Sequence, residues 1–140
     1  MMYTVDSSVW IDYFNGVDTP QAQALDAALD SDECDLVLLD VVLMEVLRGF
    51  RHLGELRTAQ AALGDFPVHV AGGEQVAYLA ASVYRSLRAR GTTVRSAIDL
   101  LVGAWCIDND VPLLHADRDF DGMVRHHGLQ TFEPPRRAIN

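Results

Sequence analysis

Residues 35–49 read DLVLLDVVLMEVLRG, an apolar run that joins a predicted strand to a predicted helix. The segment Asp35 to Leu39 shows no alternation of apolar and polar residues, which is typical of a strand covered on both faces of its sheet. Val41 to Arg48 follows directly as a helix that ends near Gly49. A buried strand that leads straight into a helix indicates an α/β fold built around a parallel sheet.

The same alternation of strands and helices continues on both sides of this stretch. The cluster Asp6-Ser7-Ser8 supplies good N-cap residues after a first strand, and Gly91 ends the longest predicted helix. We therefore expect a three-layer α/β fold in one domain, residues 1–140, with helices on both faces of a mostly parallel sheet of four or five short strands. The remaining predicted strands are residues 3–5, 67–70, 111–114 and 129–132, and the remaining helices are residues 21–29, 53–63, 74–90, 97–107 and a short one from about residue 119.

Composition places the chain among globular proteins of a reducing compartment. It has 140 residues, of which 49% are hydrophobic and 22% charged, enough for one domain with a real core. Its two cysteines, Cys34 and Cys106, lie in apolar surroundings and are expected to be buried free thiols. No signal-peptide pattern and no apolar run of membrane-spanning length is visible, so we expect a cytoplasmic protein.

The net charge of −9 is distributed very unevenly along the chain. Residues 1–47 hold ten acids and no basic residue, whereas residues 48–140 hold eleven arginines, ten acids and no lysine. Arginine is suited to a two-pronged grip on phosphate, and four arginines fall close together. These are equally well explained as a solvated helix face or as a nucleic-acid contact, with Arg85, Arg88 and Arg95 as the candidates, beside Arg90.

Acidic residues follow the predicted strands at the points where parallel strands place a functional site. Metal-assisted phosphodiester hydrolysis needs several carboxylates that converge on hard cations. In an open parallel sheet the strands converge at their carboxyl ends. Asp6 comes directly after the first strand and Asp117 shortly after residues 111–114, although helix capping is the plainer explanation for each. Asp119 and Asp121 compete with Asp117 for any such role.

Two further acids lie inside apolar helices. Asp99 closes a capping-box pattern with Ser96, yet it is the only charged residue before Asp108 in a helix that is apolar on nearly every face. Glu45 has six apolar neighbours and lies too far into its helix to be a cap. Burying a lone carboxylate costs several kcal/mol, so Glu45 requires a partner. Arg48, three residues on, is the plain alternative, and we favour a metal shared with Asp6, Asp99 and Asp117.

Taken together, four motifs resemble the PIN-domain ribonucleases, and within them the VapC-type toxins of toxin–antitoxin pairs. They run from near residue 5 to residue 120, in family order and spacing. The motifs are Val5-Asp6-Ser7-Ser8-Val9-Trp10-Ile11-Asp12, Glu45-Val46-Leu47-Arg48-Gly49-Phe50, Ser96-Ala97-Ile98-Asp99-Leu100-Leu101-Val102 and Leu113-Leu114-His115-Ala116-Asp117-Arg118-Asp119-Phe120.

The resemblance implies a PIN-like fold and an acidic site that cuts RNA with Mg²⁺ or Mn²⁺. Asp6 and Asp99 would ligate the metal, with Glu45 and Asp117 completing the pocket directly or through water. Asp119 could share the role of the fourth acid. Ser7 stands where the family often has threonine, and its hydroxyl should keep a hydrogen bond to the site. Cleavage of this kind would leave a 5′-phosphate.

The resemblance also implies partners. The expected ones are an RNA substrate, a small antitoxin that covers the toxin, and a second copy of the chain in a homodimer, with apolar helices supplying the interface. The charge of −10 over residues 1–47 is compatible with attracting a basic peptide. A PIN-like nuclease outside a toxin–antitoxin pair and a non-catalytic protein-binding module of the same fold are the alternatives.

Other classes of site fit the residues less well. A metal-independent ribonuclease would use His115 or the pair His126-His127 and would leave a cyclic phosphate. A phospho-receiver domain also binds Mg²⁺ with clustered aspartates, but it needs a lysine, and this chain has none. The lack of lysine likewise excludes a Walker-type phosphate loop.

Overall fold

The strands pair in parallel, and the first strand of the chain lies at the centre of the larger group. The computed structural model describes residues 1–135, so the last five residues of the expected domain lie outside the described residues. Strand β1 (Met2–Val5) lies between β2 (Asp35–Leu36) and β5 (Leu113–Leu114), and β3 (Leu38–Leu39) pairs with β4 (Val68–His69). Every one of these pairings is parallel.

The two hydrogen-bonded groups share one extended segment, residues 35–39. This segment is interrupted only at Val37, whose amide donates to the carbonyl of Tyr3, whereas the amide of the next residue, Leu38, donates to Pro67 on the other side. The segment therefore connects β1 to β4. Residues 36–39 are all buried, as expected for a strand without alternation.

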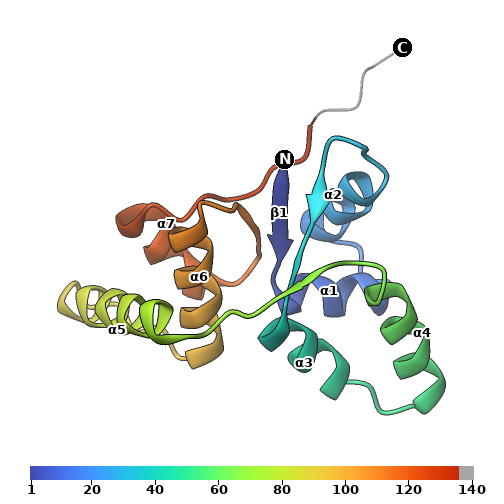
Figure 1. Ribbon diagram of the computed structural model, residues 1–140, viewed down its shortest axis with the longest axis horizontal. Coiled ribbons are helices and arrows are strands. Elements are labelled where there is room, and N and C mark those ends of the chain that lie inside the picture. Colours follow the sequence, from blue (N-terminus) through green and yellow to red (C-terminus); the bar gives the residue numbers. More distant parts are fainter. Residues whose placement is uncertain (136–140) are drawn as a thin grey trace.

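Helices cover both faces of this sheet, which confirms the expected three layers. In Figure 1, α5, α6 and α7 lie on one side of β1, and α1 to α4 lie on the other. A 3-10 turn, η1, precedes α7. The helices are α1 (Ser7–Phe14), α2 (Pro20–Leu29), α3 (Asp40–Arg48), α4 (Leu53–Leu63), α5 (Glu74–Ala89), α6 (Ala97–Asn109) and α7 (Asp121–His127), and η1 is Arg118–Phe120.

The predicted last strand, residues 129–132, is reduced to a single parallel bridge between Thr131 and Leu113. The Leu113 amide donates to the carbonyl of Gln130, and the Phe132 amide donates to the carbonyl of Leu113, so Leu113 is the one residue of β5 that pairs with this segment. Leu129 and Phe132 are buried, and they anchor the segment by packing instead of by a ladder.

Helix α6 is the most enclosed helix of the core. Its residues 102–106 are buried in succession, around the whole circumference of the helix. Cys106 is buried here as a free thiol, whereas Cys34 is only half-buried and is also free. Within residues 1–135, no helix has both the length and the apolar composition needed to cross a membrane.

Candidate metal centre

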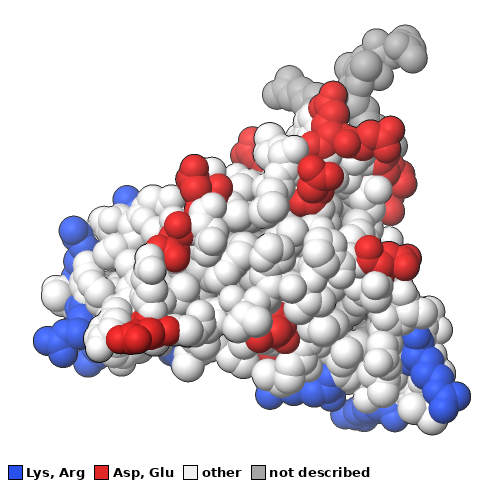
Figure 2. Space-filling view, viewed as in Figure 1, with Lys and Arg blue, Asp and Glu red and all other residues white. Residues whose placement is uncertain are grey.

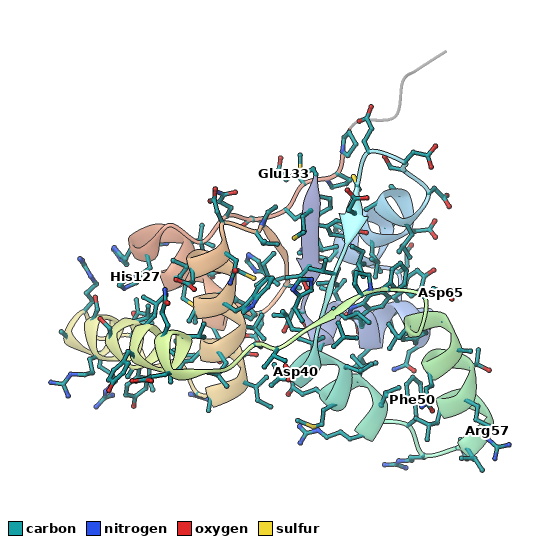
Figure 3. The ribbon with its side chains drawn as sticks, in the orientation of Figure 1. Asp40, Phe50, Arg57, Asp65, His127 and Glu133 are labelled. Carbon is teal, nitrogen blue, oxygen red and sulfur yellow. The ribbon has the colours of Figure 1, made fainter. Side chains whose placement is uncertain are left out.

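The carboxyl ends of the parallel strands meet at one edge of the sheet, and acidic residues begin there. Strand β1 runs directly into Asp6, whose amide donates to the carbonyl of Leu114 at the end of β5 at 2.9 Å. Strand β3 runs directly into Asp40 at the start of α3, beside the segment that follows β4 (Figure 3). Asp40 Oδ1 accepts the amides of Val41 and Ala71, so this acid is used to join α3 to that segment.

Asp6 combines the capping and the site roles, one on each carboxylate oxygen. Its Oδ2 accepts the Ser8 hydroxyl at 2.7 Å and the Ser8 amide at 3.4 Å, which caps α1. Its Oδ1 is buried and has no hydrogen-bond partner within the described residues. Burial raises the pKa of Asp6, and the nearby charge of Glu45 raises it further, against the lowering effect of the Ser8 and Ser7 hydrogen bonds. A buried, unpartnered carboxylate oxygen is costly unless a cation satisfies it.

Asp99 lies one turn into α6, next to the other acids. Its amide donates to Ser96 Oγ at 3.2 Å, so Ser96 caps the helix as the sequence indicates. The reciprocal half of the capping box is absent, and the Asp99 carboxylate accepts no hydrogen bond from residues 1–135. The residue is 7% exposed. Burial raises the pKa of Asp99 to about 7, with further contributions from the charges of Asp6, Asp117, Asp119 and Glu45.

Asp117 and Asp119 approach Asp99 from the turn after β5. One carboxylate oxygen from each of these three residues lies within 4.8 Å of the other two. Asp117 Oδ1 also accepts the Asp119 amide at 2.9 Å, and Asp119 Oδ2 accepts the Arg95 amide at 3.3 Å. The other oxygen of each carboxylate accepts no hydrogen bond from the part of the chain that the structure describes. The structure brings both candidates for the fourth acid beside Asp99, whereas Asp121 is not in this group.

Glu45 has the partner that its position in the sequence requires, and Arg48, the plain alternative to a metal, is beside it. The Glu45 side chain is 16% exposed, and both of its oxygens have polar neighbours. Ser7 Oγ donates to Oε1 at 2.9 Å, and Arg48 Nη2 lies 3.6 Å from Oε2. The reason is that α3 turns this position toward the start of α1 instead of into the apolar core. Glu45 still belongs to the acidic group, because its charge raises the pKa of both Asp6 and Asp99.

This donor set fits a hard divalent cation. Oxygens of Asp99, Asp117 and Asp119 lie within 4.8 Å of one another, whereas Asp6 and Glu45 are outside that group and act on Asp99 through their charges. A cation would offset this repulsion and would satisfy the unpartnered oxygen of Asp6. Oxygen donors without cysteine or histidine are typical of Mg²⁺ and Mn²⁺ sites. Asp6, Glu45, Asp99, Asp117 and Asp119 could hold such an ion. Sequence reasoning missed the Ser8 hydroxyl, although its place two residues after an N-cap aspartate was a usable signal.

The three candidate RNA-binding arginines form no ion pair with these acids within the described residues. Arg85 and Arg88 are exposed on α5, and Arg88 Nη1 donates to Thr93 Oγ1 at 2.9 Å. Arg95 is exposed immediately before α6, and its amide contacts Asp119. Figure 2 shows basic side chains at the far end of α5 and along the lower edge over α3 and α4, and acidic side chains around α2 and the loop that follows it.

The histidines are not built into an acid–base pair. His115 Nε2 lies 3.0 Å from Thr131 Oγ1, and burial lowers the pKa of His115 despite the charges of Asp121 and Asp117. His126 is exposed at the end of α7, where its charged neighbours are Arg90, Arg125 and His127. Figure 3 places His127 on the α7 side of the molecule. None of the charged neighbours of His126 is a carboxylate that could orient its ring for acid–base catalysis.

Comparison with known proteins shows the family and the fold of the chain. The sequence model of the PIN domain family matches residues 3–125. VapC ribonuclease Mb1587 of Mycobacterium bovis is 28% identical over 129 residues, which are 92% of this chain and 96% of that protein. The fold is similar to VapBC2 of Rickettsia felis bound to a promoter DNA fragment (TM-score 0.72, 14% identity, 94% of this chain and 98% of that chain). It is also similar to a toxin–antitoxin complex from Klebsiella pneumoniae (TM-score 0.64, 18% identity, 94% and 98% coverage).

Proposed function

Because this chain belongs to the PIN domain family, we propose that it is a metal-dependent endoribonuclease and the toxin of a toxin–antitoxin pair. The observation that carries the nuclease proposal is the surrounding of Asp99. This buried carboxylate has four other acids as its charged neighbours and no hydrogen-bond donor of its own within the described residues. Repulsion among these acids destabilises the folded chain. A divalent cation would offset this repulsion and would also bind the phosphodiester of a substrate.

In the proposed mechanism the chain's own carboxylates hold and orient. Asp99, Asp117 and Asp119 would hold the cation with oxygens that already lie close together, and Asp6, whose Oδ1 accepts no hydrogen bond within the described residues, would be a further ligand. When bound, Mg²⁺ or Mn²⁺ supplies positive charge against the phosphate and activates water. We assign the proton acceptor to Glu45, because Ser7 holds its Oε1 while Oε2 accepts no hydrogen bond from the described residues.

RNA is the proposed substrate, and the arginines are its proposed contacts. The mycobacterial relative is named a ribonuclease, and that activity is carried over to this chain as part of the proposal. Arg95 is the best placed of the three candidates, because its backbone already contacts Asp119. Arg85 and Arg88 would extend the contact along α5, where both are exposed.

The proposed protein partner is a small basic antitoxin. Two of the similar structures are described as VapBC2 and as a toxin–antitoxin complex, which supports a partner of this kind. Residues 1–47 hold ten acids and no basic residue, and this negative charge favours the binding of a basic peptide. A homodimer, which the resemblance implies, and a cytoplasmic location, which the sequence composition indicates, remain predictions. Light scattering of the purified chain tests the first of them.

The decisive experiment is cleavage of RNA by the purified chain with and without divalent cation. We expect cleavage with Mg²⁺ or Mn²⁺, its loss in EDTA, and 5′-phosphate product ends. Asp99→Asn should abolish it, whereas the matched control Asp108→Asn, an exposed acid on the same helix, should not. Activity that survives EDTA and leaves cyclic phosphates would favour the histidine mechanism. No cleavage at all by a chain that binds an antitoxin would favour the non-catalytic binding module.

A further inference from the structure

Arg48 lies at the edge of the acidic group and is tied to it by one loose contact. Its Nη2 is 3.6 Å from Glu45 Oε2, and its side chain is 66% exposed. It makes no hydrogen bond within residues 1–135. In the part of the chain that the structure describes, no other arginine forms an ion pair with an acid. Arg48 thus presents a cation with free donors directly beside a candidate catalytic carboxylate.

The pair with Glu45 does too little for stability to explain this placement. An i,i+3 pair whose guanidinium is 66% exposed and lies beyond hydrogen-bond distance of the carboxylate contributes little to the stability of the fold. Glu45 does not need Arg48 for orientation either, because Ser7 already holds its Oε1. The contact occupies Oε2, the oxygen that the proposed function assigns to proton transfer.

A phosphodiester is a better partner for this guanidinium than Glu45 is. Arginine binds phosphate with two parallel hydrogen bonds, whereas here one nitrogen faces one carboxylate oxygen beyond hydrogen-bond distance. A cation held by the acids would also neutralise part of the negative charge that now attracts Arg48. On the basis of the proposed function, we propose that Arg48 is a substrate-contact residue. When RNA binds, its guanidinium leaves Glu45 and pairs with a phosphate of the RNA strand, so that Glu45 Oε2 becomes free.

The test separates RNA binding from the positioning of Glu45. Binding of a fluorescein-labelled, mixed-sequence single-stranded RNA is measured in the Asp99→Asn background with Mn²⁺, where the RNA should stay intact, as a function of salt. We expect Arg48→Gln to weaken binding by roughly tenfold and to reduce the magnitude of the salt slope by about 0.7. Arg48→Lys should keep the slope and recover only part of the affinity.

Arg57 is the matched control, an exposed arginine that Figure 3 shows on α4, the helix that follows α3. Arg57→Gln should leave affinity and slope close to those of the parent. An equal loss in both variants would overturn the inference, because it would reflect net charge alone. Unchanged binding in Arg48→Gln, with only kcat lowered in the otherwise unaltered chain, would overturn it as well, because Arg48 would then merely position Glu45.

Kinetic measurements on the unaltered chain distinguish a failure of the inference about Arg48 from a failure of the proposed function. If the unaltered chain cleaves RNA with Mn²⁺ and Arg48→Gln keeps its KM, the inference about Arg48 alone falls. If the unaltered chain neither cleaves nor binds RNA, the proposed function falls and the inference falls with it. A raised KM in Arg48→Gln, with Mn²⁺ affinity equal or higher, supports both.

Discussion

Ser7 Oγ donates a 2.9 Å hydrogen bond to Glu45 Oε1, a contact that links the first turn of α1 to the middle of α3 across 38 residues of chain. Ser8, its neighbour, donates instead to Asp6 Oδ2 at 2.7 Å. Two adjacent hydroxyls at one helix start therefore orient two different acids of the candidate site.

These hydroxyls should be separable by mutation. Ser7→Ala removes the only hydrogen bond that the Glu45 carboxylate accepts within residues 1–135 and should lower kcat for RNA by roughly tenfold, the rate equivalent of one lost hydrogen bond. Ser7→Thr keeps the hydroxyl and should retain most activity. Steady-state kinetics on a defined RNA provide the measurement, and equal activity of the Ala and Thr variants would contradict the role of the hydroxyl.

Stability without metal should fall as the pH rises. Burial raises the pKa of Asp99 to about 7 from an ordinary value of 3.8, and burial also raises the pKa of Asp6. The folded chain therefore binds more protons than the unfolded chain between these two pH values. The resulting stability is fully present below about pH 4 and is lost as the pH rises through about 7.

Chemical denaturation in EDTA at pH 5 to 8 tests this effect. The free energy of unfolding should decrease over that range, Asp99→Asn should flatten the decrease, and Mn²⁺ should restore stability at pH 8 by binding the folded state. Asp108→Asn serves as the control, since Asp108 is exposed and bonded to Gln75 outside the acidic group. A free energy of unfolding that rises steadily with pH in EDTA would rule out the raised pKa.

Cation affinity should depend on pH through the same carboxyl group. Below the Asp99 pKa of about 7, a proton must leave before a cation can bind there. Mn²⁺ affinity measured by calorimetry should rise by about tenfold per pH unit up to pH 7 and level off above it. Affinity that does not change between pH 6 and 8 would place Asp99 outside the ligand set.

Asp117 and Asp119 should share the fourth acidic position. Each has one oxygen engaged by a backbone amide and lies within reach of Asp99. We expect Asp117→Asn and Asp119→Asn each to weaken Mn²⁺ binding by roughly tenfold, and the double variant to weaken it more than either. If one single variant binds Mn²⁺ like the parent, the other residue alone fills the position.

The fold was largely predictable because its signals are local. Apolar runs, the caps Asp6 and Ser96, and the stop at Gly91 mark elements whose observed ends differ from those expected by only a few residues. The last predicted strand was the exception. Residues 129–132 look like a strand, but whether they pair along their length depends on where β5 ends, and only Thr131 forms a bridge.

The candidate site was predictable in its members but not in their contacts. Capping was predictable from local sequence for Asp6, Asp117 and Ser96. A site role for Asp6 is indicated only by the structure, in which its Oδ1 is buried and accepts no hydrogen bond within the described residues. Glu45 was expected to need a partner, either Arg48 or a shared metal, and the structure shows Arg48 beside it together with a hydrogen bond from Ser7. Neither contact could be read with certainty from spacing, because one depends on how α1 crosses α3 and the other on a choice of rotamer.

The sequence by itself thus determined the α/β alternation, the helix starts and the presence of acids after strands, because periodicity and capping act within a few residues. Only the tertiary structure decided which acids meet. Parallel strands place their carboxyl ends at one edge, so Asp6 and Asp99, 93 positions apart in the chain, become electrostatic neighbours. Burial then raises the pKa of both, and that desolvation, which no local pattern encodes, makes the group a candidate for binding a cation.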